Sequence, residues 1–191
     1  MTSQARLTLM PKTLGTADSR AKAVLEKAKA QVGFIPNMYA GMANSPGLLQ
    51  TYLDGYAAFR TYSGFTPVEQ EVVFLTISRE NGCGYCTSAH SMIADKMSKV
   101  PPDILSALRS GEPIPNAKLA ALSTFTSQMF ATRGRPTTAN LKAFMDAGFE
   151  ERQVLEIVLA LAVKTLSNYS NHVNGPKLDD AFAAYAWSPK A

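Results

Sequence analysis

Two segments of the chain are apolar on nearly every side of a helix, and this limits the folds that the chain can adopt. The first follows residue 66 and contains Val72, Val73, Phe74, Leu75 and Ile77. The second lies within 150–167 and contains Val154, Leu155, Ile157, Val158, Leu159 and Leu161. A surface helix carries one apolar stripe, so a helix that is apolar all round belongs at the centre of a larger structure. We expect both segments to be buried helices.

Start and stop signals predict helices along the rest of the chain as well. Thr66-Pro67-Val68-Glu69 joins a capping threonine, a proline suited to the first helical position and a glutamate able to complete a capping box. Gly33 stands where a left-handed cap would end a helix over 19–32. Strand-like alternation of apolar and polar residues does not recur. The sequence therefore predicts an all-α fold.

An internal repeat relates the two apolar segments. A shift of 85 residues places Glu71 on Glu156, Cys83 on Asn168 and Cys86 on Asn171. It also superimposes the apolar residues that follow Glu71 on those that follow Glu156. Duplication of a buried helix hairpin, with thiols kept only in the first copy, explains this pattern.

Composition and charge exclude several classes of protein. Hydrophobic residues make up 46% of the 191, which is too many for a disordered chain. The sequence contains no run of 18 apolar residues, so we expect no membrane span. Residues 1–12 lack a signal-peptide pattern, and we therefore expect a cytoplasmic protein. The net charge is +4, but the basic residues are scattered, so we expect no binding to nucleic acid.

The two cysteines, Cys83 and Cys86, form one C-x-x-C pair, which is typical of redox or metal chemistry in an intracellular chain. Cys86 and His90 are four residues apart and share a helix face. If the chain folds back near Gly82, Glu71 comes close to His90. A helix start favours a thiolate, an imidazole can relay its proton, and a carboxylate can orient the imidazole. We predict Cys86 as the attacking thiolate and Cys83 as the accessible resolving thiol. His90 would act as the base, and Glu71 would orient it or relay the proton.

A metal site is the alternative interpretation of these side chains. Cys83, Cys86, His90 and Glu71 offer four possible zinc ligands. No second C-x-x-C or H-x-x-x-H completes a usual structural site, and Thr87 stands where attached c-type haem would need a histidine. We therefore expect neither a metal nor a cofactor.

The pattern of Glu71, Asn81, the two cysteines and His90 resembles the alkyl hydroperoxidase D-like (AhpD-like) branch of the carboxymuconolactone decarboxylase superfamily. The motif E-x(11)-C-x-x-C-x-x-x-H is matched without gaps, although Tyr85 stands where the best-known members have a histidine. The segments Gly33-Phe34-Ile35-Pro36-Asn37 and Asn44-Ser45-Pro46 also look like longer, peroxidase-related members. The decarboxylase branch lacks the cysteine pair, which argues against that activity here.

The resemblance implies a single AhpD-like domain over 1–191 with a repeated antiparallel helix hairpin. Helices within 17–62 would pack on a core made of a thiol hairpin over 66–97 and a degenerate hairpin over about 137–172. It also implies a cofactor-free peroxidase that reduces a small hydroperoxide and is itself reduced by a dithiol, or by a thioredoxin-like or lipoyl reductant. The alternatives are a disulfide reductase or redox partner of another protein, and a metal-binding or redox-sensing scaffold. The resemblance and the extent of apolar surface both predict a homo-oligomer.

Overall fold

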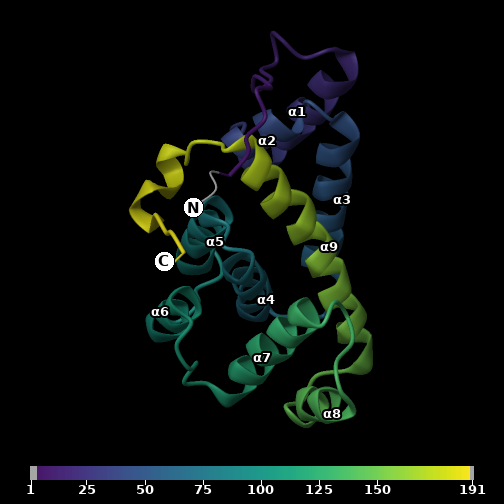
Figure 1. Ribbon diagram of the computed structural model, residues 1–191, viewed down its shortest axis with the longest axis vertical. Coiled ribbons are helices and arrows are strands. Elements are labelled where there is room, and N and C mark those ends of the chain that lie inside the picture. Colours follow the sequence, from purple (N-terminus) through teal and green to yellow (C-terminus); the bar gives the residue numbers. More distant parts are fainter. Residues whose placement is uncertain (1–3, 190–191) are drawn as a thin grey trace.

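The computed structural model describes residues 4–189, and within them all regular structure is helical (Figure 1). The all-α class is therefore confirmed. None of the helices in this range is both long and apolar enough to cross a membrane. The elements are α1 (Ser19–Val32), α2 (Asn37–Met42), α3 (Pro46–Tyr62), α4 (Pro67–Glu80), α5 (Gly84–Lys96), α6 (Pro102–Ser110), α7 (Ala117–Ala131), α8 (Thr138–Asp146), α9 (Glu151–Asn174) and the 3-10 helix η1 (Asp180–Tyr185).

Helix α4 lies at the centre of the fold, as its all-round apolar sequence predicts. It packs against α5, α6, α7 and α9, and every side chain from 69 to 78 is buried. The predicted capping box starts it: Glu69 N donates to Thr66 Oγ1 at 3.3 Å, and Thr66 N donates to Glu69 Oε2 at 2.8 Å. Gly82 adopts a left-handed conformation (φ 64°) and turns the chain from α4 into α5. The predicted thiol hairpin is therefore formed.

Helix α9 is longer than the sequence predicts, because it continues past Ser167 to Asn174. The polar residues that follow its apolar part do not end the helix. Instead, Ser167, Asn168 and Asn171 are buried and continue its inward face toward the thiol hairpin. The shift of 85 residues thus aligns the turn between α4 and α5 with the interior of one unbroken helix. The residues that the repeat aligns with the cysteines lie on this helix, opposite the hairpin.

Helix α3 runs beside α9 on the side away from α7, which brings its residues over the hairpin (Figure 1). The close approach of the two helices depends on Gly55. A Cβ atom there would lie 2.9 Å from Val163 Cγ2, which is closer than carbon atoms pack. The glycine therefore allows α3 to carry Tyr52, Tyr56 and Arg60 to the functional region.

The segment after α9 folds back over the start of α5 (Figure 1). Trp187 N donates to Ser88 Oγ at 3.0 Å, and Trp187 Nε1 donates to the carbonyl of Arg109 at 2.9 Å. A Cβ on Gly84 would lie 2.9 Å from the carbonyl oxygen of Trp187. The C-terminal segment therefore covers the turn that carries the cysteines.

The outer side of α9 exposes large apolar side chains. Leu155, Val158, Tyr169 and Val173 are all exposed, and their spacing puts them on one side of the helix. A continuous apolar face of this kind is typical of an interface between protein chains.

We predict that this face of α9 contacts a second copy of the chain. Sedimentation should give the mass of an oligomer, which is at least twice the chain mass of 20.6 kDa. Leu155→Glu should shift the protein toward the monomer, because it places a charge on the apolar face. Tyr62→Glu, at an equally exposed site on α3, is the matched control and should leave the mass unchanged. A wild-type mass near 20.6 kDa at micromolar concentration would contradict the prediction.

Candidate active site

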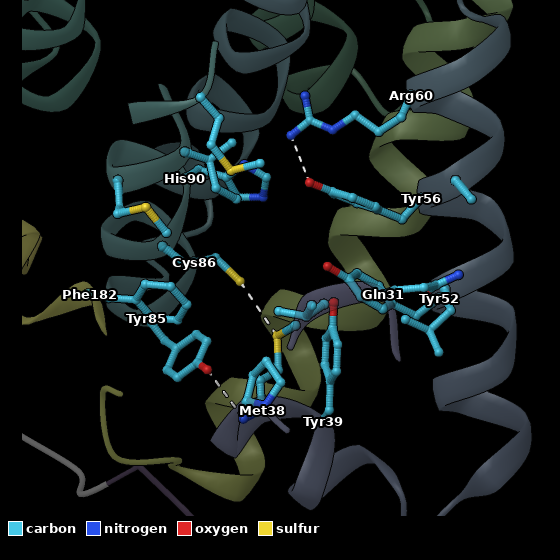
Figure 2. A pocket seen from close by; sticks show the side chains of 18 of the residues that line it. Gln31, Met38, Tyr39, Tyr52, Tyr56, Arg60, Tyr85, Cys86, His90 and Phe182 are labelled. Carbon is cyan, nitrogen blue, oxygen red and sulfur yellow. Dashed lines mark hydrogen bonds between the residues drawn. The ribbon is translucent and has the colours of Figure 1, made fainter. Parts of the chain in front are cut away.

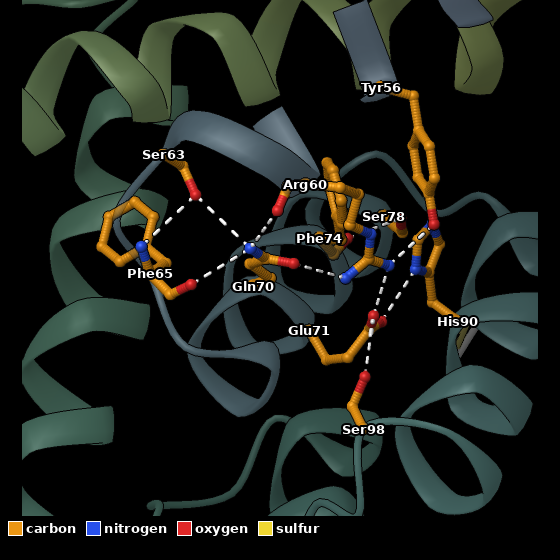
Figure 3. Close-up of polar contacts among 10 residues, drawn as sticks. All are labelled: Tyr56, Arg60, Ser63, Phe65, Gln70, Glu71, Phe74, Ser78, His90 and Ser98. Atoms are coloured by element: carbon orange, nitrogen blue, oxygen red, sulfur yellow. Dashed lines mark hydrogen bonds and ion pairs between the residues drawn. The ribbon is translucent and has the colours of Figure 1, made fainter. Parts of the chain in front are cut away.

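The carboxylate of Glu71 is fully buried on α4 and joins three segments of the protein (Figure 3). Oε2 lies 2.9 Å from His90 Nδ1 on α5, so the expected approach of Glu71 to His90 is present. Oε1 accepts a hydrogen bond from Arg60 Nη2 on α3, and Ser98 Oγ lies 3.5 Å from the same oxygen. Glu71 is thus satisfied by a cation, an imidazole and a hydroxyl.

Arg60 is a functional residue that the sequence did not reveal. Its guanidinium lies 4.9 Å from the centres of both the Tyr56 and the Phe74 rings. It also donates to the Tyr56 hydroxyl at 2.7 Å and to Gln70 Oε1 at 3.0 Å. Burial raises the pKa of Glu71, but His90 and Arg60 outweigh this effect and hold the pKa below its ordinary value. Glu71 is therefore a carboxylate whose charge is balanced by Arg60.

His90 is held as a neutral base. Burial is the main reason that its pKa falls from 6.5 to about 4, the charge of Lys164 adds to the effect, and Glu71 opposes it. Because Glu71 is ionised, Nδ1 carries the proton and donates a hydrogen bond to the carboxylate. Nε2 is then left with a free lone pair. This is the tautomer that a proton acceptor for a neighbouring thiol requires.

Cys83 and Cys86 are free thiols at the start of α5. Asn171 on α9 reaches them from the other side: its Nδ2 lies 3.2 Å from Cys86 Sγ and 3.7 Å from Cys83 Sγ. Asn81, at the end of α4, donates to Asn168 Oδ1 at 2.9 Å. The asparagines that the repeat aligns with the cysteines therefore face the thiol hairpin directly. This alignment was the signal by which Asn171 could have been assigned to the site.

The surroundings of the two thiols differ in their effect on charge. A hydrogen bond from the Cys83 thiol does most to lower the pKa of Cys86 to about 5. Burial opposes this shift, while Lys164, Ser167 and Asn168 support it. The same hydrogen bond and burial raise the pKa of Cys83. Cys86 is thus the sulfur whose pKa favours the thiolate near neutral pH.

The prediction that Cys83 is accessible to a reductant is wrong. Only 1% of Cys83 and 2% of Cys86 is exposed. The start of α5 lies under the C-terminal segment, against Trp187 and Pro189. Tyr85, between the cysteines, is part of this cover, because its hydroxyl donates to Asp179 of the same segment. Residue spacing did not predict that the segment over 179–189 would fold back over the thiols.

A cavity of about 530 Å³ reaches Cys86 and His90 from the α3 side (Figure 2). Cys83 is not among its lining residues. The wall is mainly aromatic and apolar, and Arg60 and Gln31 supply polar groups. Its aromatic and apolar lining includes Phe34, Met38, Tyr39, Tyr52, Tyr56 and Phe182. An apolar molecule can therefore reach the ionisable sulfur and the basic nitrogen together.

Residues 4–189 contain no group of three or more His, Cys, Asp or Glu side chains arranged to hold a metal ion. The four residues considered as zinc ligands are otherwise engaged. Glu71 is bound to Arg60 and to His90 Nδ1, and the amide nitrogen of Asn171 contacts Cys86. The geometry is that of a thiol site with a hydrogen-bonded imidazole.

Comparison with known proteins gives a consistent family and fold. Residues 46–126 match the model of the carboxymuconolactone decarboxylase family. A peroxidase-related protein with an alkylhydroperoxidase AhpD core from Ralstonia eutropha JMP134 has a TM-score of 0.79 and 21% identity, with all of both chains covered. A peroxidase-related protein from Silicibacter sp. TM1040 has a TM-score of 0.73 and 18% identity, covering 93% of this chain and 95% of that one.

A further structural neighbour is the debrominase Bmp8, solved as a Cys-to-Ala variant in complex with 2,3,4-tribromopyrrole. Its TM-score is 0.75 at 16% identity, with 96% of this chain and 97% of that chain covered. A search of curated protein sequences finds no match.

We predict that His90 stays neutral at pH values well below the ordinary pKa of histidine. Its imidazole signal in NMR should titrate near pH 4 and not near 6.5. The unfolded chain binds this proton near pH 6.5, so the free energy of unfolding should fall as the pH drops from 6.5 toward 4. His90→Gln identifies the signal. A midpoint near 6.5 in the folded protein would show that the imidazole is not held as described.

Proposed function

We propose that the chain is an AhpD-like member of the carboxymuconolactone decarboxylase superfamily and a cysteine-based peroxidase that reduces organic hydroperoxides. The observation that carries the proposal is one cavity lined by both Cys86 and His90. An ionisable thiol and a neutral imidazole that meet at an apolar pocket are the parts that peroxide reduction needs.

The proposed reaction uses the two thiols in sequence. The Cys86 thiolate attacks the terminal oxygen of the hydroperoxide, the O–O bond breaks, and Cys86 becomes a sulfenic acid. Nε2 of His90 takes up one proton from water at the open side of the cavity and gives it to the departing alkoxide. The alkoxide then leaves as an alcohol. The Cys83 sulfur then attacks the Cys86 sulfur, and water leaves with the Cys83 proton as the disulfide forms. The peroxide has gained two electrons, and the thiol pair has lost them.

The cavity favours a hydroperoxide with a sizeable apolar group. A volume of about 530 Å³ lies within the usual range for small-molecule sites, and hydrogen peroxide would leave most of it unfilled. Tyr39, Tyr52 and Tyr56 surround the space with aromatic rings. We therefore propose aromatic or long-chain hydroperoxides as the substrate class.

The burial of Cys83 bears on the reductant. A dithiol has to attack one sulfur of the Cys83–Cys86 disulfide, and the cavity leads to Cys86. A dithiol on a slender arm, such as a lipoyl group, can enter this cavity. A thioredoxin-like protein could reach the disulfide only if the segment around Trp187 moved away. We propose the slender dithiol as the physiological class of reductant.

Reductive debromination of an aromatic ring is a second candidate. The aromatic lining of the cavity beside Cys86 favours it, and a debrominase shares the fold. The same thiol pair would supply the two electrons as it becomes a disulfide, the Cys83 proton would replace bromine on the ring carbon, and bromide would leave. Release of bromide from a brominated pyrrole, at a rate that depends on Cys86, separates this function from the first.

We predict peroxide-dependent oxidation of a dithiol by the wild-type protein and different failures in the two cysteine variants. Cys83→Ser should stop at a sulfenic acid on Cys86 and be prone to over-oxidation. Cys86→Ser should react only slowly, and His90→Ala should slow the first step by about 10²-fold, typical of the loss of a general base. Mass spectrometry after a stoichiometric pulse of cumene hydroperoxide reads out the products.

Two outcomes would contradict this proposal. Dithiol consumption no faster than in the Cys86→Ser blank, with every hydroperoxide tried, would rule out the peroxidase. A sulfenic acid that forms at Cys83 in Cys86→Ser, while Cys86 of Cys83→Ser stays reduced, would reverse the roles of the two thiols.

A further inference from the structure

Lys164 is a fully buried lysine in the middle of α9. Its Nζ has no hydrogen-bond partner in the described structure, and no carboxylate within residues 4–189 forms an ion pair with it. A buried ammonium group without a counter-charge is strongly unfavourable. Lys164 therefore requires an anion close by that neutralises its charge.

The aromatic and acidic groups near Lys164 do not neutralise its charge. Nζ lies 5.5 Å from the centre of the Phe74 ring, a contact that replaces only part of the lost hydration. The buried carboxylate of Glu71 is already bound by Arg60 and His90. Among residues 4–189, Glu71 is therefore not free to balance the charge of the lysine.

The position of Lys164 on α9 points to the thiols. Lys164, Asn168 and Asn171 follow one another at helical spacing on the inward face. Asn171 donates to the Cys86 sulfur at 3.2 Å. The Nδ2 of buried Asn168, one turn from Lys164, also lacks a hydrogen-bond partner within residues 4–189. Two unpaired buried donors thus lie on the helix face that contacts the cysteines.

We propose that the Lys164 ammonium is the counter-ion of the Cys86 thiolate, so that this buried lysine sets the charge and the redox poise of the thiol pair. It is a positioning residue, since it acts through Cys86. The inference deepens the proposed function, because it concerns the same sulfur, but it holds for the resting protein without any peroxide.

The other charged and titratable groups around Cys86 leave Lys164 as the unbalanced cation. Arg60 and Glu71 neutralise each other, and His90 is neutral because its pKa is low. Burial raises the pKa of the surrounding tyrosines, so their hydroxyls stay protonated. The charged and titratable groups in and around the site are Cys83 just before α5, Tyr85 and His90 on α5, Tyr39 on α2, Tyr52, Tyr56 and Arg60 on α3, Glu71 on α4 and Lys164 on α9, with Asp179 bound to Tyr85.

Oxidation removes the anion that this lysine requires. When Cys86 and Cys83 form a disulfide, two electrons and the Cys83 proton leave, and Lys164 faces no thiolate. The counter-ion thus favours the reduced state and makes the disulfide a stronger oxidant. Without Lys164, the Cys83–Cys86 disulfide should be harder to reduce.

The test measures the ionisation of Cys86 in the Cys83→Ser background through the pH dependence of alkylation by iodoacetamide. Adding Lys164→Met should raise the midpoint by more than one pH unit, so that alkylation at a pH well below both midpoints becomes at least about tenfold slower. Lys164→Arg should restore most of the rate because it keeps the charge. Lys142→Met, at an exposed lysine on α8, is the control and should change nothing. An unchanged midpoint in Lys164→Met would overturn the proposal.

A second measurement covers the case in which Lys164→Met fails to fold. In Cys86→Ser the lysine has lost its counter-ion, so adding Lys164→Met should raise the melting temperature of that variant. A lower melting temperature would overturn the proposal. Where Lys164→Met does fold with both cysteines present, equilibration with glutathione should show the thiol pair shifted at least about tenfold toward the disulfide. Neither measurement uses a peroxide, so loss of the proposed peroxidase activity would not affect either result.

Discussion

The buried carboxylate of Glu71 is the constraint on which the rest of this structure depends. A charge at the centre of an apolar helix is tolerated only when it is paired and hydrogen-bonded. Arg60 reaches it from α3 and His90 from α5, so one side chain fixes three helices around the same point. The aromatic rings of Tyr56 and Phe74 pack on this network and shield it from water. The position of the imidazole beside the cavity follows from this requirement.

The division of charge then explains how the site can work. Arg60 balances Glu71, and burial keeps His90 neutral with its Nε2 free. Cys86 contacts the polar face of α9, where the amide of Asn171 and the charge of Lys164 favour a thiolate. The neutral imidazole and the ionisable sulfur thus stay separate, while both line one apolar cavity. The C-terminal segment covers the opposite side, so the cavity is the side from which a molecule can approach Cys86.

The sequence predicted what local patterns control. The capping box at Thr66, the turn at Gly82 and the meeting of Glu71 with His90 follow from residue type and spacing. It did not predict Arg60, because an arginine near the end of an amphipathic helix is usually solvated. The fold-back of Trp187 over α5 depends on contacts between distant segments, which spacing does not encode. Lys164 offered the same signal as Glu71, a lone charge in an apolar helix, and it could have been found by the same argument.

The central claim is that Glu71 maintains the imidazole that lets Cys86 react, and a single-turnover experiment tests it most directly. The reduced protein is mixed with one equivalent of cumene hydroperoxide, and the loss of both free thiols is followed with time. The account predicts one disulfide per chain in the wild type. In a folded Glu71→Gln variant, loss of the thiols should be slower by about 10²-fold, because the imidazole is no longer oriented. Equal rates in the two proteins, or wild-type thiols that persist, would contradict it.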